Sequence, residues 1–374
     1  MHLIIVVLIV LITMMKNSSS KRSILVVGLN PALQRSIKLN SLIPGSVNRG
    51  TEATVGIGGK GQDVIVAASC LVEKGSVPSL LQFLGSGYEG DALANLLEQK
   101  TGIKIDSSDD FSIRTKGKCR TCITLLDMKT EEATEIIEPS EQIEANELQS
   151  LMNKVTNAYI NEKTEGLVIM GSAPPGCPDD MYSKIISATS NESTKVILDT
   201  ATGLNEIFNI CKKMNIKPIL KVNARELCKL ANVQVATGSE SAAATEGSIL
   251  VDACKKLQDK YQTQFYAAIT DGPFFGYLLK ADLDITGWKY SIPKLHKPFI
   301  NPIGAGDATS SGLCMYICDK VDNSNESDFD KKIQKAFAWG LACGSASCMK
   351  SGNSIFELND CKIIFDGIKI DKYI

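Results

Sequence analysis

Residues 301–313, NPIGAGDATSSGL, combine a turn of small residues with an acid. Gly304, Ala305 and Gly306 precede Asp307, which stands where an apolar helix is expected to begin. Such a turn exposes unpaired backbone N–H groups at the positive end of the helix dipole, which suits a transferring phosphoryl group. An ionised Asp307 could orient a substrate hydroxyl and accept its proton. Taken alone, these residues favour the simpler interpretation of an N-cap Asp after a tight turn.

A glycine loop with a lysine inside it, Gly58-Gly59-Lys60-Gly61, lies in the segment VGIGGKGQDV. Glycines are useful in such a loop because a Cβ would keep the backbone N–H groups away from a ligand. The same segment also contains Gly56-x-Gly58-x-x-Gly61, the spacing of a dinucleotide-binding turn.

A second dinucleotide fingerprint, Gly85-x-Gly87-x-x-Gly90, follows a strand-like run and opens a helical pattern. Asp106 comes close to the position of the ribose-binding acid, at the end of a short apolar run, so the pattern is compatible with an NAD-dependent oxidoreductase. One observation against this alternative is that another strand, glycine loop and helix precede this fingerprint in the chain. The alternative also leaves the GAGD segment unexplained, and His296 is the only histidine available as a hydride-transfer acid.

Composition narrows the class of protein. The 374 residues carry a net charge of -2 and are 44% apolar, which fits one large α/β domain or two smaller ones. The near-neutral charge argues against nucleic acid or an anionic membrane as the main partner. The sequence has only two histidines, His2 and His296, which nearly excludes a His-rich metal site. A Ser-His-Asp triad would have one candidate base, and the sequence contains no G-x-S-x-G elbow for its nucleophile.

The 12 cysteines are scattered. Cys119 and Cys122 have C-x-x-C spacing, but in an alternating, strand-like stretch they point to opposite faces. A zinc site would need a second pair, and none is present in the sequence. We therefore expect reduced, mostly buried cysteines in an intracellular protein.

Residues 2–15 form an apolar run that is followed by KNSSSKR. A membrane-spanning helix needs about 20 apolar residues, and a signal peptide carries its positive charges before the apolar run. We expect residues 1–22 to be a leader outside the fold and the protein to be cytoplasmic. The alternative is a signal peptide or membrane anchor.

Behind the leader, short apolar runs alternate with helical patterns, which predicts a mostly parallel sheet covered on both faces. Strands are expected at 24–28, 80–84, 167–170, 196–198, 218–222 and 265–270. Helices are expected at 62–74, 91–100, 179–189, 224–231, 248–261, 307–318 and 331–349, and a loop at 232–247. Residues 35–50 and 119–140 instead predict two strand pairs, a small β-layer that could cover a site as a lid.

Four segments in order give the chain a family resemblance. GAGD (304–307) resembles the C-terminal signature of the ribokinase/PfkB carbohydrate kinases, and GGKG (58–61) resembles their N-terminal signature. GSAPPG (171–176) and KVNARE (221–226) lie between them in the expected order. The resemblance implies an α/β, ribokinase-like three-layer sandwich with a mostly parallel central sheet and a small β-sheet lid. It implies one kinase domain over 23–374, with lid strands roughly within 31–56 and 112–139.

Three further segments resemble the sugar-phosphate branch of that family, the 1-phosphofructokinases and tagatose-6-phosphate kinases. They are LNPALQRSIKL (29–39), PGSVNRG (44–50) and CRTCITL (119–125). In that branch two arginines, matched here by Arg49 and Arg120, hold the phosphate already on the sugar. Guanidinium is a suitable planar donor for a phosphate, although most arginines are solvated surface charges.

The same resemblance assigns the remaining site residues. On the substrate side it implies Gln34, Gly58, Gly59, Lys60, Asp63 and Ser172, with the glycine loop close to the acceptor hydroxyl. On the nucleotide side, at the other end of the cleft, it implies Lys221, Asn223, Glu226, Thr270 and Gly272. Asn223 and Glu226 would order a magnesium ion through water, and their spacing also predicts a helix capping box.

Two positions depart from the branch pattern. Gln34 stands where these enzymes usually have Asp, and Asp63 stands where they usually have Asn. Both positions face sugar hydroxyls in the resembled enzymes, so the identity of the sugar is open. The departures also invite a second alternative, a non-catalytic descendant that binds a sugar phosphate.

The resulting hypothesis is a phosphotransferase that uses ATP and Mg²⁺. The γ-phosphoryl of ATP would pass in line to a primary hydroxyl of a phosphorylated ketohexose, with Asp307 as base and the amides of residues 304–306 around the transferring group. The partners are small molecules, with no nucleic acid. A homodimer through the lid follows only by analogy with the family.

Overall fold

The computed structural model describes residues 24–73, 77–105, 107, 111–130, 132–234, 247–318 and 329–374. The predicted leader, Asp106 and most of the predicted loop at 232–247 lie outside these residues. Within them, no helix has the length and apolar character needed to cross a membrane.

The main sheet has ten strands in the order β14-β13-β12-β11-β10-β9-β8-β1-β4-β5. From β5 to β11 each strand runs parallel to its neighbours, and β12 to β14 extend the sheet with antiparallel pairs. This confirms the mostly parallel sheet. The strands are β1 (Ile24–Val27), β4 (Ser79–Ser86), β5 (Phe111–Lys118), β8 (Gly166–Met170), β9 (Lys195–Asp199), β10 (Ile219–Asn223), β11 (Phe265–Asp271), β12 (Phe275–Ala281), β13 (Ile285–Ser291) and β14 (Lys369–Lys372).

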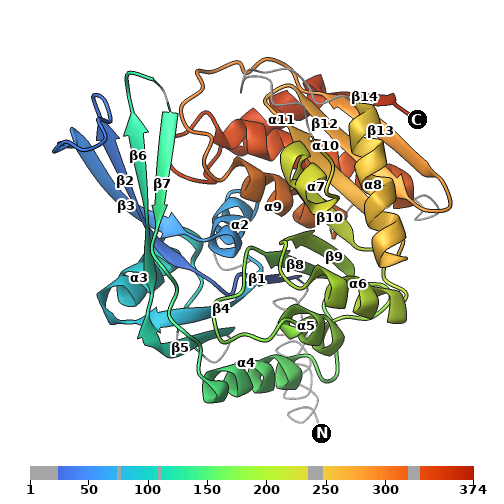
Figure 1. Cartoon of the computed structure of the whole chain (residues 1–374), viewed down its shortest axis with the longest axis horizontal. Helices are drawn as coiled ribbons and strands as arrows, with labels where there is room; N and C mark the ends of the chain where they lie inside the picture. Colours follow the sequence, from blue (N-terminus) through green and yellow to red (C-terminus); the bar gives the residue numbers. More distant parts are fainter. Residues whose placement is uncertain are drawn as a thin grey trace, which may run out of the picture.

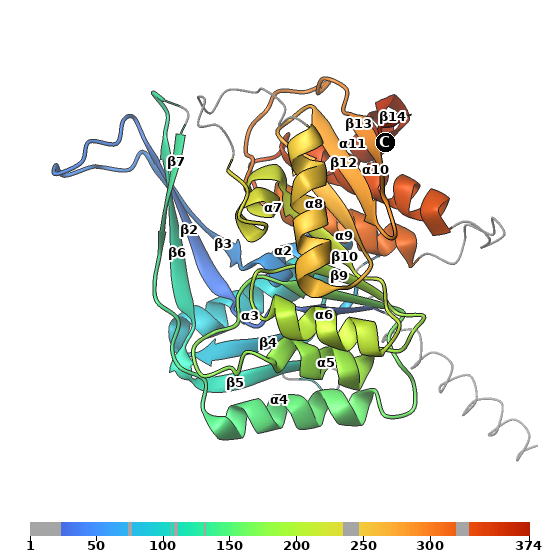
Figure 2. The ribbon, with the colours of Figure 1, turned by 45° about the vertical axis from the view of Figure 1, so that its right-hand side comes forward.

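Helices cover both faces of this sheet, as Figures 1 and 2 show. Alternate side chains of one strand enter different cores: Val26 of β1 packs in one apolar cluster and Leu25 in the other. The first cluster takes in α2 (Lys60–Ser69), α3 (Gly87–Thr101), α9 (Ala305–Ile317), α10 (Phe329–Ser347) and α11 (Leu358–Gly367). The second takes in α4 (Ala145–Ala158), α5 (Met181–Thr189), α6 (Leu204–Lys213), α7 (Ala224–Leu230) and α8 (Gly247–Tyr261). The three-layer sandwich is therefore confirmed.

A second sheet projects beside the sandwich (Figure 2). It contains β2 (Ala32–Leu39), β3 (Glu52–Gly58), β6 (Arg120–Asp127) and β7 (Glu132–Ile137) in the order β3-β2-β6-β7. The outer pairs are antiparallel, whereas β2 and β6 run parallel. We call this sheet the lid.

The pair predicted within 35–50 was wrong in its second strand, which begins only at Glu52. Residues 40–51 form the connecting loop, because Asn48 closes it through side-chain hydrogen bonds to both the N–H and the C=O of Ile43, at 2.8 and 2.9 Å. The pair predicted within 119–140 is present as β6 and β7.

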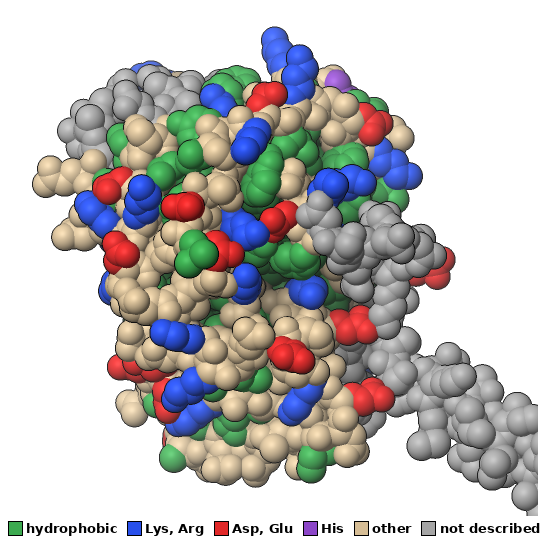
Figure 3. All heavy atoms as spheres, turned by 90° about the vertical axis from the view of Figure 1, so that its right-hand side faces the viewer, with side chains coloured by type: hydrophobic (Ala, Val, Ile, Leu, Met, Phe, Trp, Pro, Cys, Tyr) green, Lys and Arg blue, Asp and Glu red, His purple; other side chains and the backbone are tan. Residues whose placement is uncertain are grey.

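The cysteines and surface charges fit the sequence-based picture. Cys119 and Cys122 are free thiols, as are the other cysteines of the described residues. Figure 3 shows the face that lies on the right of Figure 1, where acidic and basic side chains are interspersed. Neither charge dominates the described part of this face.

Helix α9 packs closely on α10 through glycines. A Cβ on Gly344 of α10 would lie 2.7 Å from the carbonyl oxygen of Ala305 and would also overlap the hydroxyl of Thr309. A Cβ on Gly340 would lie 2.6 Å from the carbonyl oxygen of Thr309. These glycines set the spacing of the two helices, and so fix the position of the residues at the start of α9.

We expect Gly344→Ala to lower the free energy of unfolding by about 1–3 kcal/mol, because overpacking must shift α9. The sign of this change is informative, because Gly→Ala within a helix otherwise raises the free energy of unfolding by about 1 kcal/mol. Urea denaturation measures the change. Gly56→Ala is the matched control, because a Cβ there has nothing within 4 Å and a negative φ is retained. A Gly344→Ala protein as stable as the wild type would contradict this account.

Candidate active site

The start of α9 is built around a left-handed glycine. Gly304 is the N-cap with φ 81° and ψ 0°, and Asp307 is the third residue of the helix. The simple interpretation of Asp307 as the N-cap was therefore wrong. The amide of Ala305 donates to the carbonyl of Pro302 at 3.2 Å, whereas the amides of Gly306 and Asp307 have no acceptor among the described residues. Two N–H groups of the first turn remain available to an anion.

A loop after α10 holds this turn from behind. Ser354 is fully buried, and its hydroxyl donates to the carbonyl of Gly304 at 3.0 Å. Ser354 has a φ of 54°, which is uncommon for a residue with a side chain, and a Cβ on Gly304 would lie 2.8 Å from its amide nitrogen. Asn301 donates to the carbonyl of Ser351 at 3.2 Å. Sequence reasoning missed Ser354, since a lone serine carries no signal of its own.

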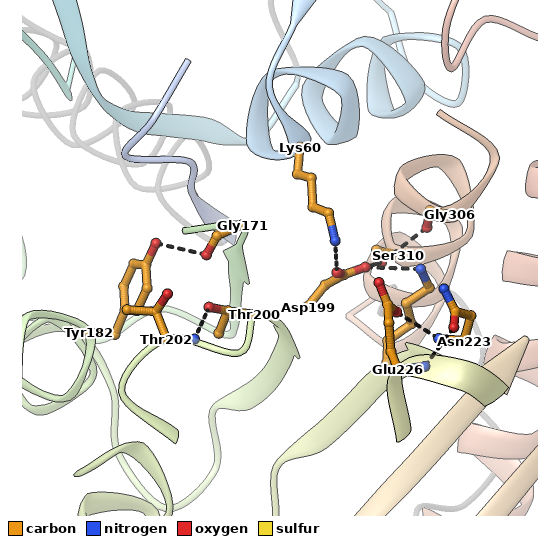
Figure 4. Close-up of polar contacts among 11 residues, drawn as sticks. Lys60, Gly171, Tyr182, Asp199, Thr200, Thr202, Asn223, Glu226, Gly306 and Ser310 are labelled. Atoms are coloured by element: carbon orange, nitrogen blue, oxygen red, sulfur yellow. Dashed lines mark hydrogen bonds and ion pairs between the residues drawn. The ribbon is translucent and has the colours of Figure 1, made fainter. Parts of the chain in front are cut away.

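Asp199 is the centre of charge in the site, and sequence reasoning missed it as well. It ends β9, is 3% exposed, and accepts from Lys60 at 2.7 Å and from Lys221 at 2.9 Å. Figure 4 shows Lys60 reaching down from α2 to Asp199, with Ser310 of α9 beside it. Burial raises the pKa of Asp199, but the two lysines outweigh it, so the pKa is lowered overall. An acid at the carboxyl end of a parallel strand was the available signal.

Lys60 and Lys221 bring positive charge to the start of α9. Burial lowers the pKa of Lys60, but the pairing with Asp199 raises it by more, so the lysine remains charged. The side chain of Lys60 keeps an exposed fraction of 44% and can also meet a ligand. The Nζ of Lys221 lies against Gly306, where a Cβ would come within 2.8 Å of it. A side chain at position 306 would displace this ammonium group, so the glycine leaves Lys221 its place beside the turn.

Asp307 is less acidic than the sequence suggested. Burial, and next the charge of Asp199, raise the pKa of Asp307 to about 7, while Lys221 and Lys60 act in the opposite direction. A carboxyl that titrates near neutrality is well suited to accept a proton from a substrate hydroxyl and release it later.

The nucleotide-side residues lie at the ends of two adjacent parallel strands. Asn223 of β10 is in register with Thr270 of β11, and Gly272 follows with φ 65°. Asn223 and Glu226 form the predicted capping box at the start of α7: each side chain accepts from the other's amide, at 2.8 and 2.9 Å.

The Asn223–Glu226 pair fits a magnesium ion. The capping box uses only one carboxylate oxygen of Glu226, and both side chains are exposed or partly exposed. Mg²⁺ takes oxygen ligands and keeps several waters, so a site with few protein groups is suitable. No cluster of three His, Cys, Asp or Glu residues with metal-binding geometry occurs among the described residues.

A cavity of about 490 Å³ lies between the lid and the start of α9. Eight predicted site residues line it: Gln34, Gly59, Lys60, Asp63, Arg120, Ser172, Gly304 and Asp307. Gly59, with φ 104°, joins β3 to α2, and a Cβ there would lie 3.0 Å from the Cα of Pro31. The neighbouring Gly58 packs against Gln34 instead of lining the cavity.

Arg120 enters the cavity from the lid. Its guanidinium donates to the carbonyl of Asn30 at 3.0 Å and more weakly to that of Pro31, at 3.4 Å. The side chain of Asn30 in turn donates to Ser172 at 3.3 Å and accepts from Ser140 at 2.8 Å. Asn30 therefore links Arg120 to Ser172, both predicted substrate-binding residues, a role that sequence reasoning did not assign.

Arg49 is not brought to this cavity. It is exposed in the loop between β2 and β3, which projects away from the body in Figure 2. The lining also does not include Ala305 and Gly306, or the predicted nucleotide-binding residues Lys221, Asn223, Glu226, Thr270 and Gly272.

The glycines of the oxidoreductase alternative have a packing explanation. A Cβ on Gly85 would lie 2.5 Å from the carbonyl carbon of Lys118, and one on Gly90 would lie 2.8 Å from that of Gly85. They let α3 approach β4 and the β5–β6 corner. The short apolar run at 103–105, which this alternative needs as its second strand, does not form a strand.

The chain is similar to known proteins in sequence and in fold. The model of the pfkB family carbohydrate kinases matches residues 21–359. Phosphofructokinase-2 from Escherichia coli, in complex with fructose-6-phosphate, has a TM-score of 0.70 at 19% identity over 92% of this chain and 98% of that one. A possible 1-phosphofructokinase from Thermotoga maritima has a TM-score of 0.63 at 19% identity over 94% and 99%. Ribokinase from Giardia lamblia has a TM-score of 0.69 at 13% identity over 91% and 99%.

At these identities the solved structures establish a ribokinase-like fold and nothing finer. The family match covers most of the chain, and it overturns the alternative of an NAD-dependent oxidoreductase. The chain belongs to the pfkB family of carbohydrate kinases and is a sugar kinase with ATP as its cosubstrate.

Proposed function

We propose that this kinase transfers the γ-phosphoryl group of ATP to a primary hydroxyl of a ketohexose phosphate. The observation that carries the proposal is that one cavity holds both Asp307 and Arg120. The first is a carboxyl suited to proton transfer, and the second is a planar cation suited to a phosphate already on the substrate.

In this proposal, different residues of the chain have separate roles in the phosphoryl transfer. Asp307 orients the acceptor hydroxyl and takes its proton as the new O–P bond forms. The free amides of Gly306 and Asp307, with Lys221 close by, oppose the negative charge on the transferring group. Lys60 adds positive charge from the sugar side. The lid limits the access of water, which would otherwise compete as the acceptor.

Asn223 and Glu226 are the residues that would hold magnesium, through water. When bound, the ion neutralises phosphate charge. Thr270 and Gly272 border the same strand ends and are proposed to contact the nucleotide.

The direct test is ATP consumption with fructose 1-phosphate, fructose 6-phosphate, tagatose 6-phosphate, free fructose and free ribose. We expect turnover with at least one ketohexose phosphate and a much lower kcat/KM with the free sugars. Turnover only with free sugars would contradict the substrate class. Binding of a sugar phosphate without turnover would support the non-catalytic alternative.

Asp307→Asn is expected to lower kcat by roughly 10²–10⁴-fold, because an amide cannot accept the proton. The affinity for ATP should change little, which equilibrium binding measures. Asp366→Asn makes the same chemical change on an exposed face of α11 and should leave kcat unaltered. A near-normal rate for Asp307→Asn would show that another group is the base.

The pH profile should report the same group. Asp307 acts in its deprotonated form, so kcat/KM should fall as pH falls through about 7, by about tenfold per unit. In the residual activity of Asp307→Asn this dependence should be absent. A wild-type profile that is flat from about pH 6 to pH 8 would argue against Asp307.

Arg120→Ala is expected to raise the KM for the sugar phosphate by roughly 10- to 100-fold, the effect of losing a hydrogen bond to a charged group. The KM for ATP should stay within about threefold of the wild type. Arg49→Ala is the matched comparison, because that arginine lies outside the cavity of the single chain. Equal changes in both KM values for Arg120→Ala would remove its role as a phosphate ligand.

A further inference from the structure

A second cavity, of about 250 Å³, lies between the lid and the sandwich, and we call it the side cavity. Its walls come from lid strands β2 and β3, from α2, from the end of α3, and from the loops at residues 300–303 and 351–353. Lys60, Arg120 and Asp307 line the reaction cavity but not the side cavity. The two cavities share the residues Gln34, Asp63, Ile303 and Asn353.

Lys100 brings a positive charge to the side cavity. It is half-buried in the last turn of α3, and its side chain has no hydrogen-bond or ion-pair partner among the described residues. The charges on the lid wall neutralise each other, because Lys38 is bound to Glu52 at 2.7 Å. Burial raises the pKa of the remaining acid, Asp63, well above its usual range. The lining therefore has a cation to offer to an anionic ligand.

Uncharged polar groups face the same space from two sides. Ser36 and Thr54 are directly opposite each other in the β2–β3 pair, so both hydroxyls stand on one face of the lid. Neither hydroxyl has a hydrogen-bond partner among the described residues. Across the cavity, Asn353 accepts from Asn301 at 3.2 Å through its oxygen, which leaves its amide nitrogen available.

The size of the side cavity restricts the ligand. Pockets for drug-sized ligands measure about 300–1,000 Å³, so a space of about 250 Å³ suits a molecule no larger than a monosaccharide and is too small for a nucleotide. Val66, Leu126 and Ile300 give the lining apolar surface against which a carbon skeleton can pack. Together with Lys100 and the free hydroxyls, these residues fit a short hydroxylated molecule with one anionic group.

We propose that the side cavity binds a hydroxylated small organic anion, separate from both substrates, whose anionic group pairs with Lys100 and whose hydroxyls bond to Thr54 and Asn353. Such a ligand connects the lid, through Thr54, to the sandwich, through Lys100 and Asn353. The acceptor sugar lies between the same two parts of the molecule. Both ligands therefore favour the same arrangement of the lid, and each raises the affinity for the other. This site goes beyond the proposed function, because no step of the phosphoryl transfer uses it.

The site is tested by calorimetric binding of glycerol 3-phosphate to the full-length protein without ATP or sugar. Lys100→Met keeps the apolar stem and removes the charge, so binding should weaken by at least about tenfold. Lys104→Met makes the same change on an exposed side chain outside the cavity and should bind like the wild type. Arg120→Ala removes the cation of the reaction cavity and should also bind like the wild type.

The controls make the result decisive. Glycerol, which lacks the anionic group, should bind at least about tenfold more weakly than glycerol 3-phosphate. Circular dichroism establishes that each variant is folded. Binding that is lost in Arg120→Ala but kept in Lys100→Met would locate the probe in the reaction cavity and overturn the proposal. Equal binding of glycerol, or no binding of glycerol 3-phosphate to the wild type, would overturn it as well.

The coupling is measured with an acceptor sugar that the enzyme phosphorylates, after subtraction of any turnover with the probe alone. Saturating glycerol 3-phosphate should lower the KM for that sugar by about fivefold in the wild type and in Lys104→Met, and should leave it unaltered in Lys100→Met. An unchanged or raised KM in the wild type would refute the coupling. If no sugar is phosphorylated, the proposed function fails, whereas the calorimetric result still decides whether the site exists.

Discussion

The buried carboxylate of Asp199, held between two lysines, is the interaction on which the site depends. A lone carboxylate in this position would be strongly unfavourable, and removing one partner of a buried ion pair typically costs about 3–5 kcal/mol. Lys60 comes from α2, Lys221 from β10 and Asp199 from β9, so the pairing joins three elements. It also sets the electrostatics of Asp307, whose pKa responds to all three charges.

Glycines keep the turn at the start of α9 compact. Three groups approach the start of α9 from different sides: Ser354 against Gly304, Lys221 against Gly306, and α10 through Gly344. Each approach leaves no room for a side chain. The small residues of the GAGD segment therefore have a packing role in addition to the anion-binding role proposed for them.

Much of the architecture could be predicted from the sequence, because buried parallel strands appear as continuous apolar runs. The runs that became β1, β4, β8, β9, β10 and β11 were all found. The antiparallel extension β12–β14 and the edge strand β5 were not. Polar and apolar residues are mixed in β5, β13 and β14, whereas β12 is mostly apolar and was missed without such a reason. Helices α4, α6 and α11 were missed for a related reason: their polar faces dilute the apolar pattern.

Site residues could be predicted where function leaves a local pattern. The capping box of Asn223 and Glu226 and the glycine-rich turn before Asp307 are patterns of that kind. Asp199 and Ser354 act only through residues more than 20 positions away, so local spacing could not reveal them. Arg49 shows the converse, because a motif match located it on a loop that the fold carries away from the cavity.

Gly59 is the whole connection between the lid and α2: β3 ends at Gly58, and the helix begins at Lys60. A joint of one residue, closed in by Pro31 and Gln62, has almost no slack. Because Lys60 follows this joint directly and holds Asp199, the position of β3 is tied to that of the buried ion pair through a single residue.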